Sequence, residues 1–157
     1  MTVRRPSTLA RLRRVRPWMI AELANGQWAL LDAQLRLWTR PTGALVRAHP
    51  GGPLPAATHA ADVARLAAAA ERASRSVSRA SRYGFFRPSC LVRSLALARL
   101  LEREGVPGSL IRVGVRRIAG TLDAHAWIEL DGRVIGDDPR RTRAFTPLGT
   151  LAARDVR

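Results

Sequence analysis

The hydrophobic pattern of the chain changes its period at Gly105, and this change limits the possible folds more than any other feature. Residues 90–104 are apolar around most of a helical circumference, which is typical of a helix in the middle of a domain. Ser89 is a favoured N-cap for this helix, and Gly105 follows it at the position that accepts a left-handed conformation. From Ile111 onwards apolar and polar residues alternate, which predicts a β-strand.

Further strands are predicted after this first one. Residues 122–130 form the next strand, and Asp131-Gly132 is a strong signal for a hairpin turn that leads into residues 133–137. Helices therefore come first along the chain and an antiparallel sheet follows. This order predicts an α+β fold, with a buried helix packed on a small antiparallel sheet.

Helical patterns also occupy much of the first half of the chain. Apolar residues recur at spacings of three and four between Trp18 and Trp38. Asn25-Gly26 interrupts this stripe, which allows two shorter helices in place of one. Residues 60–82 are rich in alanine and predict another helix.

Residues 39–58 separate these helices and are rich in proline and glycine. We interpret them as a linker with a short helical turn around residues 44–47. This divides the chain into an N-terminal helical segment with its linker, residues 1–58, and a core, residues 59–157. We expect the two parts to form one compact unit.

The net charge is high, because 27 basic residues, all of them arginine, face 12 acidic residues and give +15. This charge favours acidic partners such as nucleic acid, an anionic membrane surface or an acidic peptide, although a solvated basic surface explains it as well. No apolar run is long enough to span a membrane. Residues 1–16 are rich in arginine and lack the features of a secretory signal, so we expect a cytoplasmic protein. Attachment of these residues to a membrane surface is a weaker alternative.

Cys90 is the only cysteine, which excludes an intrachain disulfide and a zinc site built on cysteines. We expect no metal and no other cofactor. The residue is either a small buried hydrophobe or a reactive thiol. At the first turn of the buried helix its sulfur would lie near backbone N–H groups that have no partner within the helix. These groups lower the pKa of a thiol there, which favours the thiolate, and they can also bind an oxyanion.

His125 lies within the second predicted strand. Alternate residues of a strand share a face, so His125, Trp127 and Glu129 point to the same side. The alanines on either side of His125 leave room for another element to approach it closely. A lone histidine is often a satisfied core residue, but the other two histidines lie in or beside the linker. His125 is therefore the candidate base.

An acid that orients the imidazole would complete a triad, and two neighbouring acids are candidates. A two-residue loop at Asp131-Gly132 would place Asp138 opposite His125. A three-residue loop over residues 130–132, with Gly132 as a left-handed bulge, would place Asp137 there. The pattern alone leaves both registers open.

Several segments together resemble a known family: Cys90-Leu-Val-Arg-Ser-Leu-Ala-Leu, Leu100-Leu101, Gly105, Ile111-Arg-Val-Gly-Val115, Ala124-His-Ala-Trp-Ile-Glu and Asp131-Gly132. The family is the leader peptidase of lasso peptide biosynthesis, whose members have a transglutaminase-like, papain-related core. The resemblance is specific over residues 86–138, weaker over residues 28–45, and does not extend to residues 1–16.

The resemblance implies a role for each candidate residue. Cys90 matches the nucleophile of the family and His125 matches its base. Asp137 matches the third member of the triad, and this favours the bulged hairpin over the tight one. Asp138, its immediate neighbour, is the competing candidate.

The resemblance also implies partners. Members of the family remove the leader from a ribosomally made precursor, and a separate ATP-dependent cyclase then closes the ring. A small recognition protein of winged-helix form usually holds the leader. Residues 1–80 are predicted as helices and linker without the strands of such a module, so we expect the recognition protein to be a separate chain. The basic helices before residue 82 would suit an acidic leader or recognition protein.

Two other functions compete with the peptidase. The first is acyl transfer on the same triad, by an enzyme like a transglutaminase or an arylamine acetyltransferase. The second is a basic nucleic-acid-binding protein. The chain contains no recognisable nucleic-acid-binding module, and its aromatic content of 5% offers few stacking platforms, so we expect no nucleic-acid partner.

Overall fold

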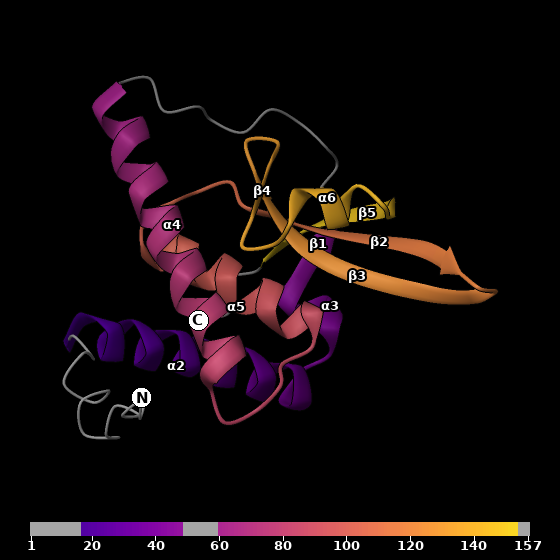
Figure 1. Ribbon diagram of the computed structural model, residues 1–157, viewed down its shortest axis with the longest axis horizontal. Coiled ribbons are helices and arrows are strands. Elements are labelled where there is room, and N and C mark those ends of the chain that lie inside the picture. The colour runs from indigo at the N-terminus through magenta and orange to yellow at the C-terminus, as the bar shows by residue number, and fades with distance from the viewer. Residues whose placement is uncertain (1–16, 49–59, 154–157) are drawn as a thin grey trace, which may run out of the picture.

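The computed structural model describes residues 17–48 and 60–153 of the chain, and within them helices and a sheet form separate layers (Figure 1). The helices are α2 (Pro17–Thr39), α3 (Thr42–Leu45), α4 (Ala60–Tyr83), α5 (Cys90–Arg103) and α6 (Pro139–Thr142). The strands are β1 (Val46–Ala48), β2 (Leu110–Ile118), β3 (Thr121–Leu130), β4 (Arg133–Ile135) and β5 (Thr146–Ala153). The predicted α+β arrangement is confirmed.

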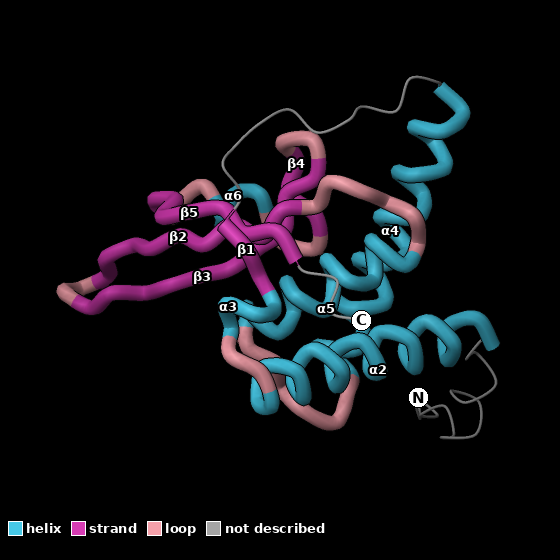
Figure 2. The backbone as a smooth tube through the Cα atoms, turned by 180° about the vertical axis from the view of Figure 1, so that it is seen from behind, coloured by secondary structure: helices cyan, strands magenta, loops and turns pink. Residues whose placement is uncertain are grey.

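The strands of the described residues form one antiparallel sheet in the order β1-β5-β2-β3-β4. The β2–β3 hairpin projects away from the helices, which Figure 2 shows from behind. Helix α5 packs against β3 on one side and against α2 and α4 on the other. The sheet and the outer helices therefore share α5 as their common contact.

Helix α5 is central, as its apolar circumference predicted. Its buried residues are Val92, Ser94, Leu95, Ala96, Leu97, Ala98, Leu100 and Leu101. The predicted ends are also confirmed. Ser89 caps the helix by accepting a hydrogen bond from the backbone N–H of Val92 at 3.3 Å, and Gly105 has a φ of +71°.

Helix α2 runs without a break through Asn25-Gly26, so the division into two helices that the sequence allowed is wrong. The reason lies in the contact between α2 and α4. A Cβ on Gly26 would lie 2.1 Å from the carbonyl oxygen of Ser76 on α4, so glycine permits a close approach of the two helices. Tertiary packing here outweighs the preference of glycine for irregular backbone.

The predicted linker contains more regular structure than its composition indicates. Helix α3 ends at Leu45, and residues 46–48 form β1, which pairs antiparallel with β5. The helical turn expected around residues 44–47 lies slightly earlier, as α3. The strand at residues 46–48 was not predicted, because pairing with β5 gives its backbone a partner that local composition does not reveal. Residues 49–59, and with them the proposed boundary at residue 58, lie outside the described part of the chain.

The β3–β4 hairpin is tight. Leu130 pairs with Arg133, and both loop residues have positive φ angles, +49° at Asp131 and +73° at Gly132. These are the angles of a two-residue type I′ turn. The three-residue bulged loop, which the family resemblance favoured, is therefore wrong.

None of the described helices combines the length and the apolar character that crossing a membrane requires.

Candidate active site

Cys90 is the first residue of α5, and its side chain is half-buried against the edge of the core. Ser89 accepts hydrogen bonds from two backbone N–H groups at the start of the helix. Its hydroxyl accepts from the N–H of Val92, and its carbonyl oxygen accepts from the N–H of Arg93. The N–H groups of Cys90 and Leu91 are the remaining donors of the first turn. The thiol thus lies at the positive end of the helix dipole.

His125 and Asp137 form the closest polar contact of the site. The imidazole Nε2 lies 2.7 Å from Oδ2 of Asp137, and the two side chains are 4% and 12% exposed. A carboxylate accepts hydrogen bonds, so this contact fixes the proton of the neutral imidazole on Nε2. Nδ1 is then the nitrogen that can take up a proton from another group.

Asp138 does not contact His125 and instead caps a helix. Its Oδ1 accepts from the backbone N–H of Arg140 at 2.8 Å and caps the short helix α6. Its own N–H donates to Oδ1 of Asp137 at 2.8 Å. Asp137, rather than Asp138, is therefore the acid that lies against His125.

The position of Asp137 follows from the end of β4. The register of the tight hairpin, continued unchanged, would bring residue 138 opposite His125. Strand β4 ends at Ile135, however, and Gly136 turns the chain with a φ of +75°. The next residue, Asp137, then reaches the imidazole.

This turn also contacts α5. The guanidinium of Arg93 donates to the carbonyl oxygen of Gly136 at 3.3 Å, and a Cβ on Gly136 would lie 2.7 Å from Cδ2 of Leu97. Arg93 lies one helical turn after Cys90. The segment that carries Asp137 therefore connects the strand of His125 with the helix that begins at Cys90.

Aromatic side chains cover the other side of the imidazole. The rings of His125 and Trp127 lie on the same side of β3 with centroids 6.1 Å apart, and Phe145 lies 5.2 Å from His125. Gly114, which pairs with His125 in the sheet, makes room for this cluster, since a Cβ there would lie 2.9 Å from the Trp127 ring. Phe145 follows α6, and no sequence pattern singled it out.

Glu129 shares the face of His125, as the strand alternation predicted, but it bonds elsewhere. It accepts from Nε of Arg112 at 2.8 Å and from Nε1 of Trp127 at 3.0 Å. Both carboxylate oxygens are thereby engaged away from the imidazole. Glu129 holds Trp127 in place and is no alternative to Asp137.

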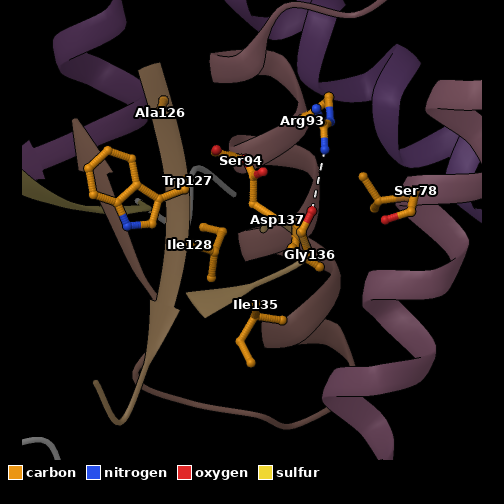
Figure 3. Close-up of a pocket in the computed structure, with 11 residues that line it drawn as sticks. Ser78, Arg93, Ser94, Ala126, Trp127, Ile128, Ile135, Gly136 and Asp137 are labelled. Carbon is orange, nitrogen blue, oxygen red and sulfur yellow. Dashed lines mark hydrogen bonds between the residues drawn. The ribbon is translucent and has the colours of Figure 1, made fainter. Parts of the chain in front are cut away.

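A small pocket adjoins the turn at Gly136 and Asp137 (Figure 3). Its walls come from α4, α5, β3, the end of β4 and the two residues after it, and include Ser78, Arg93, Ser94, Trp127 and Asp137. Cys90 and His125 do not line it. The pocket therefore borders the acid of the site, and it is not the cleft in which a substrate would meet the thiol.

The described residues bring together two parts of a general-base site, the imidazole of His125 and the carboxylate of Asp137. The free thiol of Cys90 begins α5, which packs against the strand that carries His125. The described residues contain no group of three or more His, Cys, Asp or Glu side chains that could hold a metal ion.

Comparison with known proteins gives one match. A family model described as the transglutaminase-like superfamily matches residues 27–150, an interval that contains Cys90, His125 and Asp137. No curated protein and no solved structure shows a match to the chain.

Proposed function

Because the chain belongs to the transglutaminase-like superfamily, we propose that it is a cysteine peptidase with a Cys-His-Asp triad. In this proposal Cys90 is the nucleophile, His125 is the base and Asp137 orients the imidazole. The observation that carries it is the 2.7 Å contact between Nε2 of His125 and Oδ2 of Asp137. In the proposed triad the other ring nitrogen, Nδ1, accepts the proton of the Cys90 thiol.

The reaction proceeds in two steps. The thiolate of Cys90 attacks the scissile carbonyl carbon, and the N–H groups of Cys90 and Leu91 stabilise the oxyanion that forms. His125 donates its proton to the leaving amine, the C–N bond breaks, and an acyl-enzyme remains. His125 then takes a proton from water, which attacks the thioester and releases the acid and the free thiol.

The proposed substrate is the leader region of a ribosomally synthesised lasso peptide precursor. The Cys90 and His125 motifs, which resemble those of lasso leader peptidases, support this substrate. A separate recognition protein would present the leader, and an ATP-dependent cyclase would use the new N-terminal amine. The free thiol of Cys90 suits the reducing conditions of the cytoplasm, where we place the reaction.

The decisive experiment incubates the chain with a precursor peptide, with and without a recognition protein, and weighs the products. We expect one cut between leader and core, and no cut by Cys90→Ala, which should remain folded. Cleavage by Cys90→Ala at the wild-type rate would refute the triad. Cleavage by the wild-type chain without any preference for leader-containing peptides would refute the proposed substrate but not the chemistry.

The same experiment separates hydrolysis from acyl transfer, which also occurs in this superfamily. Adding an excess of a primary amine tests which acceptor resolves the acyl-enzyme. A peptidase should give mainly the free carboxylic acid, because water is its acceptor. Predominant amide formation at the expense of the acid would show a transferase instead.

A second proposal concerns the partner. We propose that an acidic leader or recognition protein docks on the basic side of the helices. Arg65 and Arg72 of α4 pair there with Asp62 at 3.6 Å and Glu104 at 3.2 Å, yet their side chains remain 66% and 52% exposed. Complex formation should weaken as salt concentration rises, since salt screens exposed charges. An affinity independent of ionic strength would exclude electrostatic docking.

A further inference from the structure

Helix α2 carries a second apolar face that no described element covers. Its inner side packs against α4 and α5 through buried residues such as Leu30 and Ala33. Its outward stripe, defined here as Trp28, Leu31, Leu35 and Trp38, is exposed by 64%, 37%, 58% and 77%. In Figures 1 and 2, α2 lies on the opposite side of α5 from the sheet. A helix that is apolar on both sides usually makes a second contact.

The outward stripe contains no charged residue, and the charged residues elsewhere on α2 are paired. Helix α2 contains three charged residues, Glu22, Asp32 and Arg36, and each is paired within the chain. Glu22 binds Arg79 at 2.8 Å, and Asp32 binds both Arg36 at 2.9 Å and Arg99 at 3.3 Å. A neutral stripe on a chain of net charge +15 offers nothing for a charged partner to recognise.

The spacing of the outward stripe is symmetric. Its residues follow one another at intervals of three, four and three, with tryptophan at both ends and leucine in the middle. These are the a and d positions of a heptad repeat. An antiparallel copy of the same helix, centred near Ala33, would place Trp28 opposite Trp38 and Leu31 opposite Leu35. A two-fold interface requires this kind of self-complementary surface.

We propose that the chain forms a homodimer in which two α2 helices pack antiparallel through their outward stripes. The occupant of the stripe is a second copy, because an identical helix matches both its spacing and its lack of charge. Tryptophan is also among the residue types enriched in the side chains that dominate interface energetics.

The area of the stripe sets the expected strength of the dimer. A tryptophan side chain buries about 150–250 Å² when fully covered, so Trp28 and Trp38 each have roughly 100–200 Å² left to bury. A standard interface covers about 800 Å² per partner. The stripe and its flanks therefore support an interface at the low end of the range, and the dimer should dissociate on dilution.

Sedimentation of the full-length chain at concentrations from roughly 1 μM to 1 mM tests the proposal. We expect a monomer–dimer equilibrium, and a dissociation constant at least about tenfold larger for Leu35→Glu, which places charges at the centre of the interface. Leu148→Glu is the matched control, because Leu148 is 68% exposed on β5, away from the stripe. A wild-type monomer throughout, or equal effects of both variants, would overturn the proposal. Circular dichroism establishes that each variant is folded.

Cross-linking tests the orientation separately. In a Cys90→Ala background, Trp28→Cys and Trp38→Cys chains are mixed and oxidised. An antiparallel dimer should form the mixed disulfide, and Trp28→Cys alone should form little, because its two copies would lie roughly 15 Å apart along the helix axis. Preferential Trp28→Cys homodimers would show a parallel contact and reject the arrangement. A monomeric chain that uses the stripe only to bind a recognition protein would reject the homodimer altogether.

Discussion

Two adjacent carboxylates after the β3–β4 hairpin illustrate how single residues acquire different tasks. Asp137 contacts the imidazole of His125, whereas Asp138 caps α6. The two side chains are chemically identical, so their different contacts come from the backbone turn that precedes them.

Replacing each carboxylate in turn separates these tasks. Asp137→Ala should lower kcat/KM for the precursor by roughly 10²-fold or more, because the imidazole loses its orienting acid. Asp138→Ala should leave kcat/KM within a few-fold and cost at most about 0.5–2 kcal/mol of stability, the value of a helix N-cap. Steady-state kinetics and urea unfolding measure the two effects. Equal kinetics for both variants would mean that neither acid orients the base.

Gly136 offers a second test at the residue scale. Its φ of +75° strains any other residue, and a Cβ there would also meet Leu97 at 2.7 Å. Gly136→Ala should cost about 1–2 kcal/mol from backbone strain and a further ~1–3 kcal/mol from overpacking. It should also reduce activity by displacing Asp137.

The matched control is Gly132→Ala. Gly132 has a similar φ of +73°, but a Cβ added there would meet no atom within 4 Å. It should therefore show the strain of about 1–2 kcal/mol alone, with activity retained. Urea unfolding and precursor cleavage, measured on both variants, give the comparison. If both lose the same stability and activity, the contact with Leu97 has no role in placing the acid.

At the scale of elements, the contact between α2 and α4 determines whether the glycine within α2 can be replaced by a larger residue. Gly26 lies in the middle of α2, where local propensity favours alanine by about 1 kcal/mol. The carbonyl of Ser76 nevertheless occupies the space that a methyl group would need.

We therefore expect Gly26→Ala to destabilise the protein by roughly 1–3 kcal/mol, since backbone atoms cannot yield as a flexible side chain can. The neighbouring Asn25 is exposed, and Asn25→Ala should instead add up to about 0.5 kcal/mol by propensity alone. Thermal unfolding of the two variants provides the measurement. A stabilised Gly26→Ala would show that the two helices can separate without cost.

The strands differ in how well the local sequence pattern predicts them. The sequences of β2 and β3 alternate clearly, and both strands were predicted from that pattern. β5 contains Pro147 and Gly149, which weaken a strand signal, and its pairing with β2 shifts register between Val113 and Gly114. It was missed because its place in the sheet depends on partners far away in the sequence.

At the scale of the whole molecule, the core joins the outer helices to the sheet. Leu30 of α2, Leu95 of α5 and Ile128 of β3 belong to one hydrophobic cluster. Cooperative unfolding of the described elements is the physical consequence of such a shared core.

Leu30→Ala tests this expectation. Leu30 is fully buried, so its truncation should cost about 2–5 kcal/mol. Loss of helical circular dichroism and loss of amide hydrogen-exchange protection in β2 and β3 should follow the same denaturation curve at a lower midpoint. Leu148→Ala, on an exposed side chain, should shift that curve little. Separate transitions for the two signals would show that α2 unfolds independently of the sheet.

The sequence alone determined the features that depend on neighbouring residues. The ends of α5, the continuous helix α4, the alternation of β2 and β3, and the turn at Asp131-Gly132 follow from caps, periodicity and turn chemistry, which act over a few residues. The pairing of His125 with Asp137 instead of Asp138, the close approach at Gly26, the strands β1 and β5, and the contact of Phe145 with His125 were decided by the tertiary structure. Each of these depends on atoms brought together from distant segments, and local pattern carries no information about which distant atoms will meet.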